Sequence, residues 1–225
     1  MKITYALIII CVLVYAFFNM ASPGEVDDLY ETFGFSADNL REGKVWTPIT
    51  SIFVHGNIVH LFFNMLALFF FGRALEEDMS KNKFIIIFLV GGIVGNIFSM
   101  FFYSPYELFV GASGAIFTIM GVAMIKKPFE LIFFPTLIPI PLLFVGIVYT
   151  LYTILAFFFG GDPNVAYTAH LAGLGLGVLI GFYEAGIKKS LLVILLIAIT
   201  LFFVLEFLIF VIGIFDYTAA VNALF

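Results

Sequence analysis

The chain of 225 residues is 63% hydrophobic and only 11% charged. Soluble globular domains are usually about 45–50% apolar and about 25% charged, so this composition excludes a water-soluble fold and predicts a protein that crosses the membrane several times. The net charge of −5, from 10 Lys and Arg against 15 Asp and Glu, leaves no basic surface for nucleic acid.

Seven apolar stretches can be compared with the roughly 20 residues that a helix needs to cross about 30 Å of hydrocarbon. In chain order they cover approximately residues 3–20, 52–71, 84–103, 112–125, 142–160, 166–183 and 191–215. Backbone in lipid must satisfy its own hydrogen bonds, so each stretch predicts a helix. We therefore expect an all-α membrane protein with a single domain over residues 1–225.

The Lys and Arg residues predict how these helices are oriented. With a cytoplasmic N-terminus, the inner connections hold every Lys and Arg except Arg41 and Lys44, whereas the opposite orientation inverts this bias. The second, fourth and sixth stretches then run from outside to inside. A cleaved signal peptide is an alternative for residues 3–20, but this run exceeds the usual signal core of roughly 7–15 residues, which favours a retained helix.

Polar side chains interrupt the second stretch. His60 and Asn64 are four residues apart and therefore share a helix face. Taken alone, this spacing favours a hydrogen-bonded pair that joins two helices. His55 lies nearer the outer boundary, where a wetted histidine needs no special role.

The fourth stretch contains Ser113 in a run of small residues that starts at Gly111. Residues 112–125 cover only about 21 Å at 1.5 Å per residue, so we expect the helix to begin below the outer surface. Ser113 would then lie at a buried helix N-terminus, where unpaired N–H groups favour a developing negative charge. A small-residue packing motif is the alternative, and it is favoured if this run is considered alone.

The sixth stretch combines a histidine with a row of glycines. Gly173, Gly177 and Gly181 are spaced four apart, which allows another helix backbone to approach closely. His170 lies three residues before Gly173 and so on the same face. We expect His170 to contact the neighbouring helix.

Together these three stretches carry the components of acyl transfer. Ser113, His170, His60 and Asn64 all fall in the outer halves of helices that run inward, so they share a depth. A nucleophile, a base and additional hydrogen-bond donors at a helix N-terminus are what acyl transfer requires. No acidic residue is near the Ser or either His in sequence, which favours a Ser–His dyad over a triad.

With these motifs in order, the chain resembles the rhomboid family of intramembrane serine proteases. The motifs are His60-Leu-Phe-Phe-Asn64, Gly111-Ala-Ser113-Gly, and Ala169-His170-Leu-Ala-Gly173 followed by Gly177. The resemblance implies that Ser113 is the nucleophile and His170 the base, while His60 and Asn64 help to bind the oxyanion. It also implies that Phe117 packs against the catalytic histidine.

The resemblance carries further expectations. It implies a six-helix core over about residues 1–185, to which the stretch at about 191–215 adds a seventh helix. It implies transmembrane protein substrates that are cut in or beside a helix, with neither a cofactor nor a metal. We expect a multi-pass protein of a prokaryotic plasma membrane whose active site opens to the outside; the oligomeric state is not indicated.

Three further features lie outside these motifs. The first outer loop often carries Trp-Arg in this family, and here it reads Trp46-Thr47. Arg73-Ala-Leu-Glu76 also resembles the family, and we interpret it as a structural contact that fixes an inner loop. Glu206 is the one acidic residue inside an apolar stretch; a protonated carboxyl bonded to a neighbouring helix is favoured over a triad with His170.

Three alternatives compete with a serine protease. A transporter would also place polar residues near the midplane, but it would usually show two repeated halves, and none is apparent. A catalytically inactive rhomboid-like scaffold that binds membrane proteins is the second, although both dyad residues are present. A metalloprotease is weaker, because the chain has no His-Glu-x-x-His motif and no acidic ligand beside His60.

Overall fold

The computed structural model describes residues 2–133, 139–163 and 165–222. Helices dominate the described residues, as the sequence predicts. They are α1 (Ile3–Phe18), α2 (Pro23–Phe33), α3 (Ala37–Arg41), α4 (Thr47–Thr50), the 3-10 turn η1 (Ser51–Phe53), α5 (Ile58–Ala67), the π-helical segment η2 (Leu68–Gly72), α6 (Arg73–Glu76), α7 (Lys81–Ser99), α8 (Ser113–Lys126), α9 (Leu142–Phe159), α10 (Tyr167–Ala185) and α11 (Ile187–Asn222). A short antiparallel pair, β1 (Leu131–Ile132) and β2 (Ile140–Pro141), joins α8 to α9.

Five of the described helical segments are long and apolar enough to cross a membrane. They are the continuous run Ile58–Glu76, α7, α9, α10 and the part of α11 at Ile187–Val204. The all-α membrane fold is therefore confirmed, whereas α1 and α8 are shorter apolar helices. The predicted start of the second helix at residue 52 is wrong, because Asn57 caps α5 by accepting the His60 N–H at 2.8 Å.

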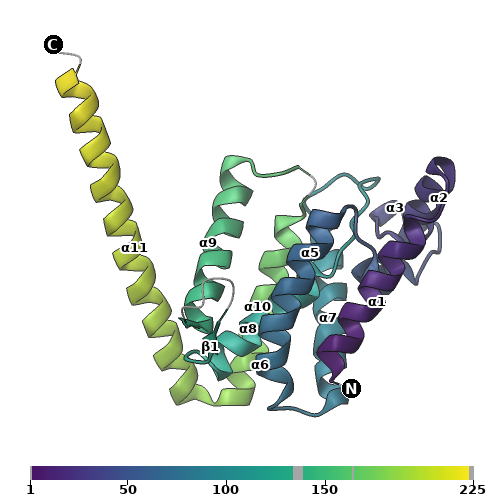
Figure 1. Ribbon diagram of the computed structural model, residues 1–225, viewed down its shortest axis with the longest axis horizontal. Helices are drawn as coiled ribbons and strands as arrows, with labels where there is room; N and C mark the ends of the chain where they lie inside the picture. The colour runs from purple at the N-terminus through teal and green to yellow at the C-terminus, as the bar shows by residue number, and fades with distance from the viewer. Residues whose placement is uncertain (1, 134–138, 164, 223–225) are drawn as a thin grey trace.

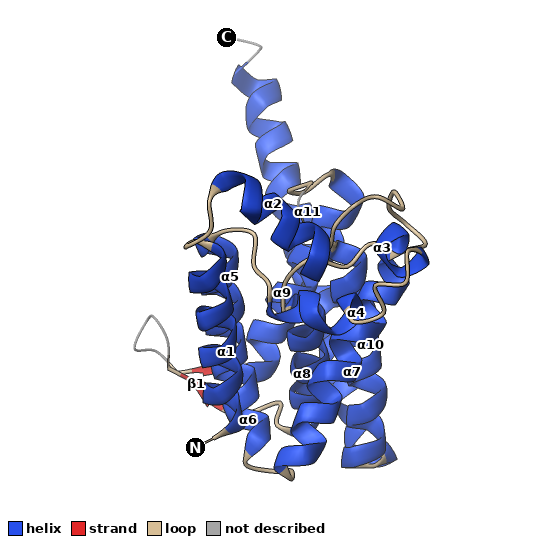
Figure 2. Cartoon of the chain, turned by 90° about the vertical axis from the view of Figure 1, so that its right-hand side faces the viewer, coloured by secondary structure: helices blue, strands red, loops and turns tan. Residues whose placement is uncertain are grey.

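Helix α8 forms the centre of the bundle. Every residue from Gly114 to Ile125 is buried, and Figure 2 shows α8 beside α7 and α10, its main neighbours. A Cβ at Gly121 would lie 2.8 Å from the Leu174 carbonyl oxygen, so α8 and α10 meet backbone to backbone. Small residues on both helices make this approach possible.

Carboxylates fix the helix ends on the side of the bundle where α8 ends. Glu76 accepts hydrogen bonds from the Thr4 N–H at 3.2 Å and the Thr4 hydroxyl at 2.7 Å, so it caps the first turn of α1. Glu184 of α10 pairs with Lys83 of α7 and, at 3.4 Å, with Lys126 of α8. The contacts of Glu76 agree with the structural interpretation of the Arg73–Glu76 motif.

Helix α11 stands largely apart from the other helices. It leans away from them over most of its length (Figure 1), and only 11% of its Ile187–Val204 window is buried. Val193 is buried in its first turns, where α11 meets α8 and α10. The predicted seventh helix therefore exists, but the remaining helices build the core without its C-terminal half.

Candidate active site

Ser113 is the first residue of α8 and is half-buried. The loop before it enters the bundle through Gly111, which has φ +119° and donates its N–H to the Ser51 carbonyl at 2.9 Å. The first intrahelical bond runs from the Ile116 N–H to the Ala112 carbonyl at 2.9 Å, so the N–H groups before Ile116 have no acceptor within α8. These groups can receive a negatively charged oxygen beside Ser113.

His60 and Asn64 lie against the backbone of this loop. A Cβ placed on Gly111 would be 2.7 Å from His60 Nε2 and 3.4 Å from Asn64 Nδ2. The close approach and the positive φ both require glycine at this position. The structure therefore brings both polar side chains of α5 to the segment that leads into Ser113.

His170 lies in the first turns of α10 and faces α8. Its imidazole stacks on the Phe117 ring with centroids 4.4 Å apart and an interplanar angle of 11°. Tyr167 contacts the same imidazole edge to face at 6.0 Å. Phe117 is one turn beyond Ser113, so the stack holds His170 over the N-terminal turns of α8.

Helices α8 and α10 are in close contact one turn from His170. The Thr118 hydroxyl lies 2.9 Å from the Gly173 carbonyl oxygen and 3.1 Å from the Gly114 carbonyl oxygen. A Cβ on Gly173 would overlap the Gly114 carbonyl. Because Gly114 follows Ser113 and Gly173 follows His170 by one turn, the two helices hold these residues on facing turns.

Unpaired polar atoms gather at this end of the bundle. Over the described residues, the buried side-chain atoms without a hydrogen-bond partner are His55 Nε2, Asn64 Nδ2 and His170 Nδ1. Buried polar groups are normally paired, so an unpaired group in a native structure usually has a use. Asn64 lies against the loop that leads to Ser113, His170 stacks on Phe117 of α8, and His55 contacts the ring of His60.

A comparison with protein-family models matches residues 42–187 to the rhomboid domain. The chain belongs to the rhomboid family. Its rhomboid domain therefore extends from the loop before α4 to the first residue of α11, and it includes all the residues described above.

Individual rhomboids from bacteria are similar to this one. The "Putative rhomboid protease YdcA" of Bacillus subtilis is 34% identical over 144 residues, which cover 64% of this chain and 69% of the relative. The "Rhomboid protease GlpG" of Haemophilus influenzae is 27% identical over 194 residues, covering 84% of this chain and 94% of the relative. The "Rhomboid protease GluP" of Bacillus subtilis is 35% identical over 122 residues, but the match spans only 24% of that protein.

Two expectations about this rhomboid need correction. His55 is not wetted: it is 1% exposed, and its ring lies 5.2 Å from that of His60. Glu206 is exposed on α11 and has no hydrogen bond to a neighbouring helix among the described residues, and His170 Nδ1 has no partner there either. Neither interpretation of Glu206 therefore describes this structure. In the loop between η1 and α5, Val54 and His55 are buried whereas Gly56 and Asn57 are exposed, and this division could not be read from the sequence.

The position that often carries arginine in rhomboids is filled differently here. Thr47 is fully buried, and its hydroxyl donates to the Lys44 carbonyl at 2.8 Å. Trp46 donates its indole N–H to the Thr32 carbonyl at 2.9 Å. The Thr47 contact fixes the turn before α4 and the Trp46 contact joins this turn to α2, and neither contact uses a charged side chain.

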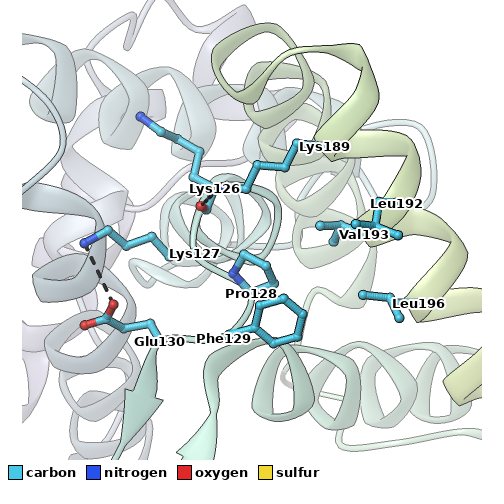
Figure 3. Close-up of a pocket in the computed structure, with 9 residues that line it drawn as sticks. All are labelled: Lys126, Lys127, Pro128, Phe129, Glu130, Lys189, Leu192, Val193 and Leu196. Atoms are coloured by element: carbon cyan, nitrogen blue, oxygen red, sulfur yellow. Dashed lines mark hydrogen bonds and ion pairs between the residues drawn. The ribbon is translucent and has the colours of Figure 1, made fainter.

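The described residues around Ser113 and His170 form no metal site, and the cavity in Figure 3 lies away from these two residues. Within the described ranges, no three His, Cys, Asp or Glu side chains are grouped closely enough to hold a metal ion. The cavity of about 360 Å³ opens at the C-terminal end of α8, beside the first turns of α11. Its walls combine Lys126, Lys127, Lys189 and Glu130 with apolar side chains, and none of the residues around Ser113 lines it.

Proposed function

We propose that this rhomboid is an intramembrane serine endopeptidase in which Ser113 is the nucleophile and His170 the general base. Relatives that are named as rhomboid proteases support protease activity for the family. The observation that carries the finer assignment is the backbone contact between α8 and α10, which holds the Ser113 and His170 turns face to face. A serine needs an adjacent base to become a nucleophile.

The reaction follows from these positions. His170 takes the hydroxyl proton while Ser113 Oγ attacks the scissile carbonyl carbon, and the carbonyl oxygen becomes an oxyanion. Collapse of the tetrahedral intermediate breaks the C–N bond, and His170 returns the proton to the leaving amine. Water then attacks the acyl-enzyme by the same proton transfers, which releases the second product and restores Ser113.

The oxyanion would be bound at the N-terminus of α8. The free N–H groups of its first turn, together with His60 and Asn64 from α5, provide donors where negative charge develops. Asn64 Nδ2 is buried and has no partner among the described residues, so its donor is available to the substrate. Donors that are already in place in a site that excludes bulk water need no reorganisation during the reaction.

In this proposal the Phe117 ring stabilises and orients the His170 imidazole, as a carboxylate does in a triad. The imidazolium formed during attack lies on the face of Phe117, and a cation within about 6 Å of an aromatic face is stabilised. The stack also restricts rotation of the imidazole. A dyad can therefore keep its base oriented without an acidic partner at Nδ1.

The substrates are proposed to be membrane proteins that are cut in or beside a transmembrane helix. A substrate must leave its helical conformation before Ser113 can reach a carbonyl carbon, and unpaired backbone groups cost several kcal/mol each in lipid. Substrates with Gly, Pro or polar residues near the cleaved bond should therefore be preferred. The distribution of Lys and Arg supports a plasma-membrane orientation with a cytoplasmic N-terminus and an outward-opening site.

Covalent labelling tests the assignment directly. Purified protein is treated with a fluorophosphonate probe, and cleavage of a transmembrane substrate is followed in parallel. Wild type should be labelled by the probe and should cleave the substrate. Neither Ser113→Ala nor His170→Ala should be labelled, and neither should cleave. Ser104→Ala, which changes an exposed serine of the outer loop, is the control and should behave as wild type. A correctly folded wild type that neither labels nor cleaves would support an inactive scaffold instead.

A further inference from the structure

His55 is a buried imidazole that the proposed reaction does not use. It lies in the loop between η1 and α5, is 1% exposed, and precedes His60 by five residues. The chain has 3 histidines, and the other two are assigned to the oxyanion and the base. A histidine that is enclosed this completely needs a physical reason to be there.

The ring of His55 is held by a nearby backbone carbonyl. Its Nδ1 lies 3.2 Å from the Phe53 carbonyl oxygen, and because a carbonyl only accepts, Nδ1 carries the proton. The His55 carbonyl in turn accepts a hydrogen bond from the Tyr30 hydroxyl at 3.2 Å. The side chain is thereby restrained by η1 and the peptide backbone is restrained by α2.

This restrained ring packs on His60. The two imidazoles meet edge to face, with centroids 5.2 Å apart and an interplanar angle of 62°. His60 also contacts the Gly111 backbone, and the Gly111 N–H bonds to the Ser51 carbonyl at 2.9 Å. Ser51 and His55 belong to the same η1 segment and loop, so one segment holds both the loop that leads to Ser113 and the ring that His60 touches.

We propose that His55 is a positioning residue that fixes the imidazole of His60 beside Gly111, where it donates to the oxyanion. This inference rests on the proposed function, because it assigns a supporting role within the same site. His55 touches neither the substrate nor Ser113 in this scheme, so it acts only through His60. The backbone hydrogen bond at Nδ1 makes histidine more suitable than an apolar ring, because it sets the orientation of the ring as well as its volume.

A double-mutant cycle tests this coupling. His55→Ala should lower kcat about tenfold with KM within twofold, since displacing a catalytic group by about 1 Å can cost on the order of 10² in rate. In a His60→Ala background the same change should have no further effect, because residues that act through one another are not additive. His55→Phe keeps a ring against His60 without the Nδ1 bond, so its kcat should be intermediate.

Tyr30→Phe is the matched control, because it removes the hydrogen bond to the His55 backbone while the imidazole stays. Its kcat should remain within twofold of wild type. An equal loss in Tyr30→Phe would show that the loop rather than the ring is important, and a full tenfold loss from His55→Ala in the His60→Ala background would show that His55 acts independently. Either result overturns the inference, as does a wild-type kcat in both His55 variants. Failure of the protease assignment is separately visible as a wild type that is not labelled at Ser113.

Discussion

Substitution of Gly173 tests whether the spacing of α8 and α10 sets the reactive geometry. A Cβ at this position would overlap the Gly114 carbonyl and would lie 3.1 Å from Thr118 Oγ1. The overlap involves backbone, which cannot rotate away, so Gly173→Ala requires the two helices to separate by an amount on the order of 1 Å. Separation on that scale displaces His170 relative to Ser113.

The effect on rate and stability can be estimated from this displacement. A misplacement of about 1 Å can cost on the order of 10² in rate, so kcat of Gly173→Ala should fall about 100-fold. Overpacking of this kind also costs about 1–3 kcal/mol of stability, which partly cancels against the gain of up to about 1 kcal/mol from replacing a helical glycine. Thermal stability in detergent should therefore fall modestly while activity falls strongly.

Gly175 provides the matched control on the same helix. A Cβ there would meet no atom within 4 Å, so Gly175→Ala adds the same methyl group without moving α10. It should keep wild-type kcat and should melt at the same or a higher temperature. If cleavage by Gly173→Ala stays within twofold of cleavage by Gly175→Ala, close helix contact is not what aligns the site.

Four further predictions concern the dyad, the oxyanion donor Asn64 and two glutamates. Combining Ser113→Ala with His170→Ala should be no worse than either change alone, because the two residues act as one unit; a further measurable loss of cleavage in the double variant would contradict this. Asn64→Ala should lower kcat by about 10–10³-fold without blocking fluorophosphonate access, and an unchanged kcat would reduce Asn64 to a helix contact. Glu76→Ala should destabilise the protein by about 1–2 kcal/mol through loss of the α1 cap, while Glu76→Gln, which keeps one acceptor, should lose less in the same unfolding measurement. Glu206→Gln should leave cleavage within about tenfold of wild type, whereas loss approaching 10⁴ with intact stability would restore a triad.

The sequence alone determined the membrane fold and the candidate residues of the active site. Composition and the lengths of the apolar stretches require helices, because an unpaired backbone cannot exist in lipid. Polar residues in such helices stand out against their surroundings, so His60, Asn64, Ser113 and His170 could be selected by spacing and depth. The stack of Phe117 on His170 was expected from the family resemblance and is present at 4.4 Å.

Contacts between distant segments could only be decided by the tertiary structure. The depth of His55 depends on how η1 and α2 fold over it, and no local pattern distinguishes a loop histidine that is wetted from one that is 1% exposed. Helix α5 begins at Ile58, directly after its Asn57 cap. The apolar residues before the cap belong to η1 and the following loop, and hydrophobicity alone does not separate them from the helix. The exposure of Glu206 depends on α11 leaning away from the bundle (Figure 1), and the high mean hydropathy of its Ile187–Val204 window does not indicate where the helix packs. Periodicity and composition report on one helix at a time, whereas burial and alignment of reactive groups depend on which backbones meet.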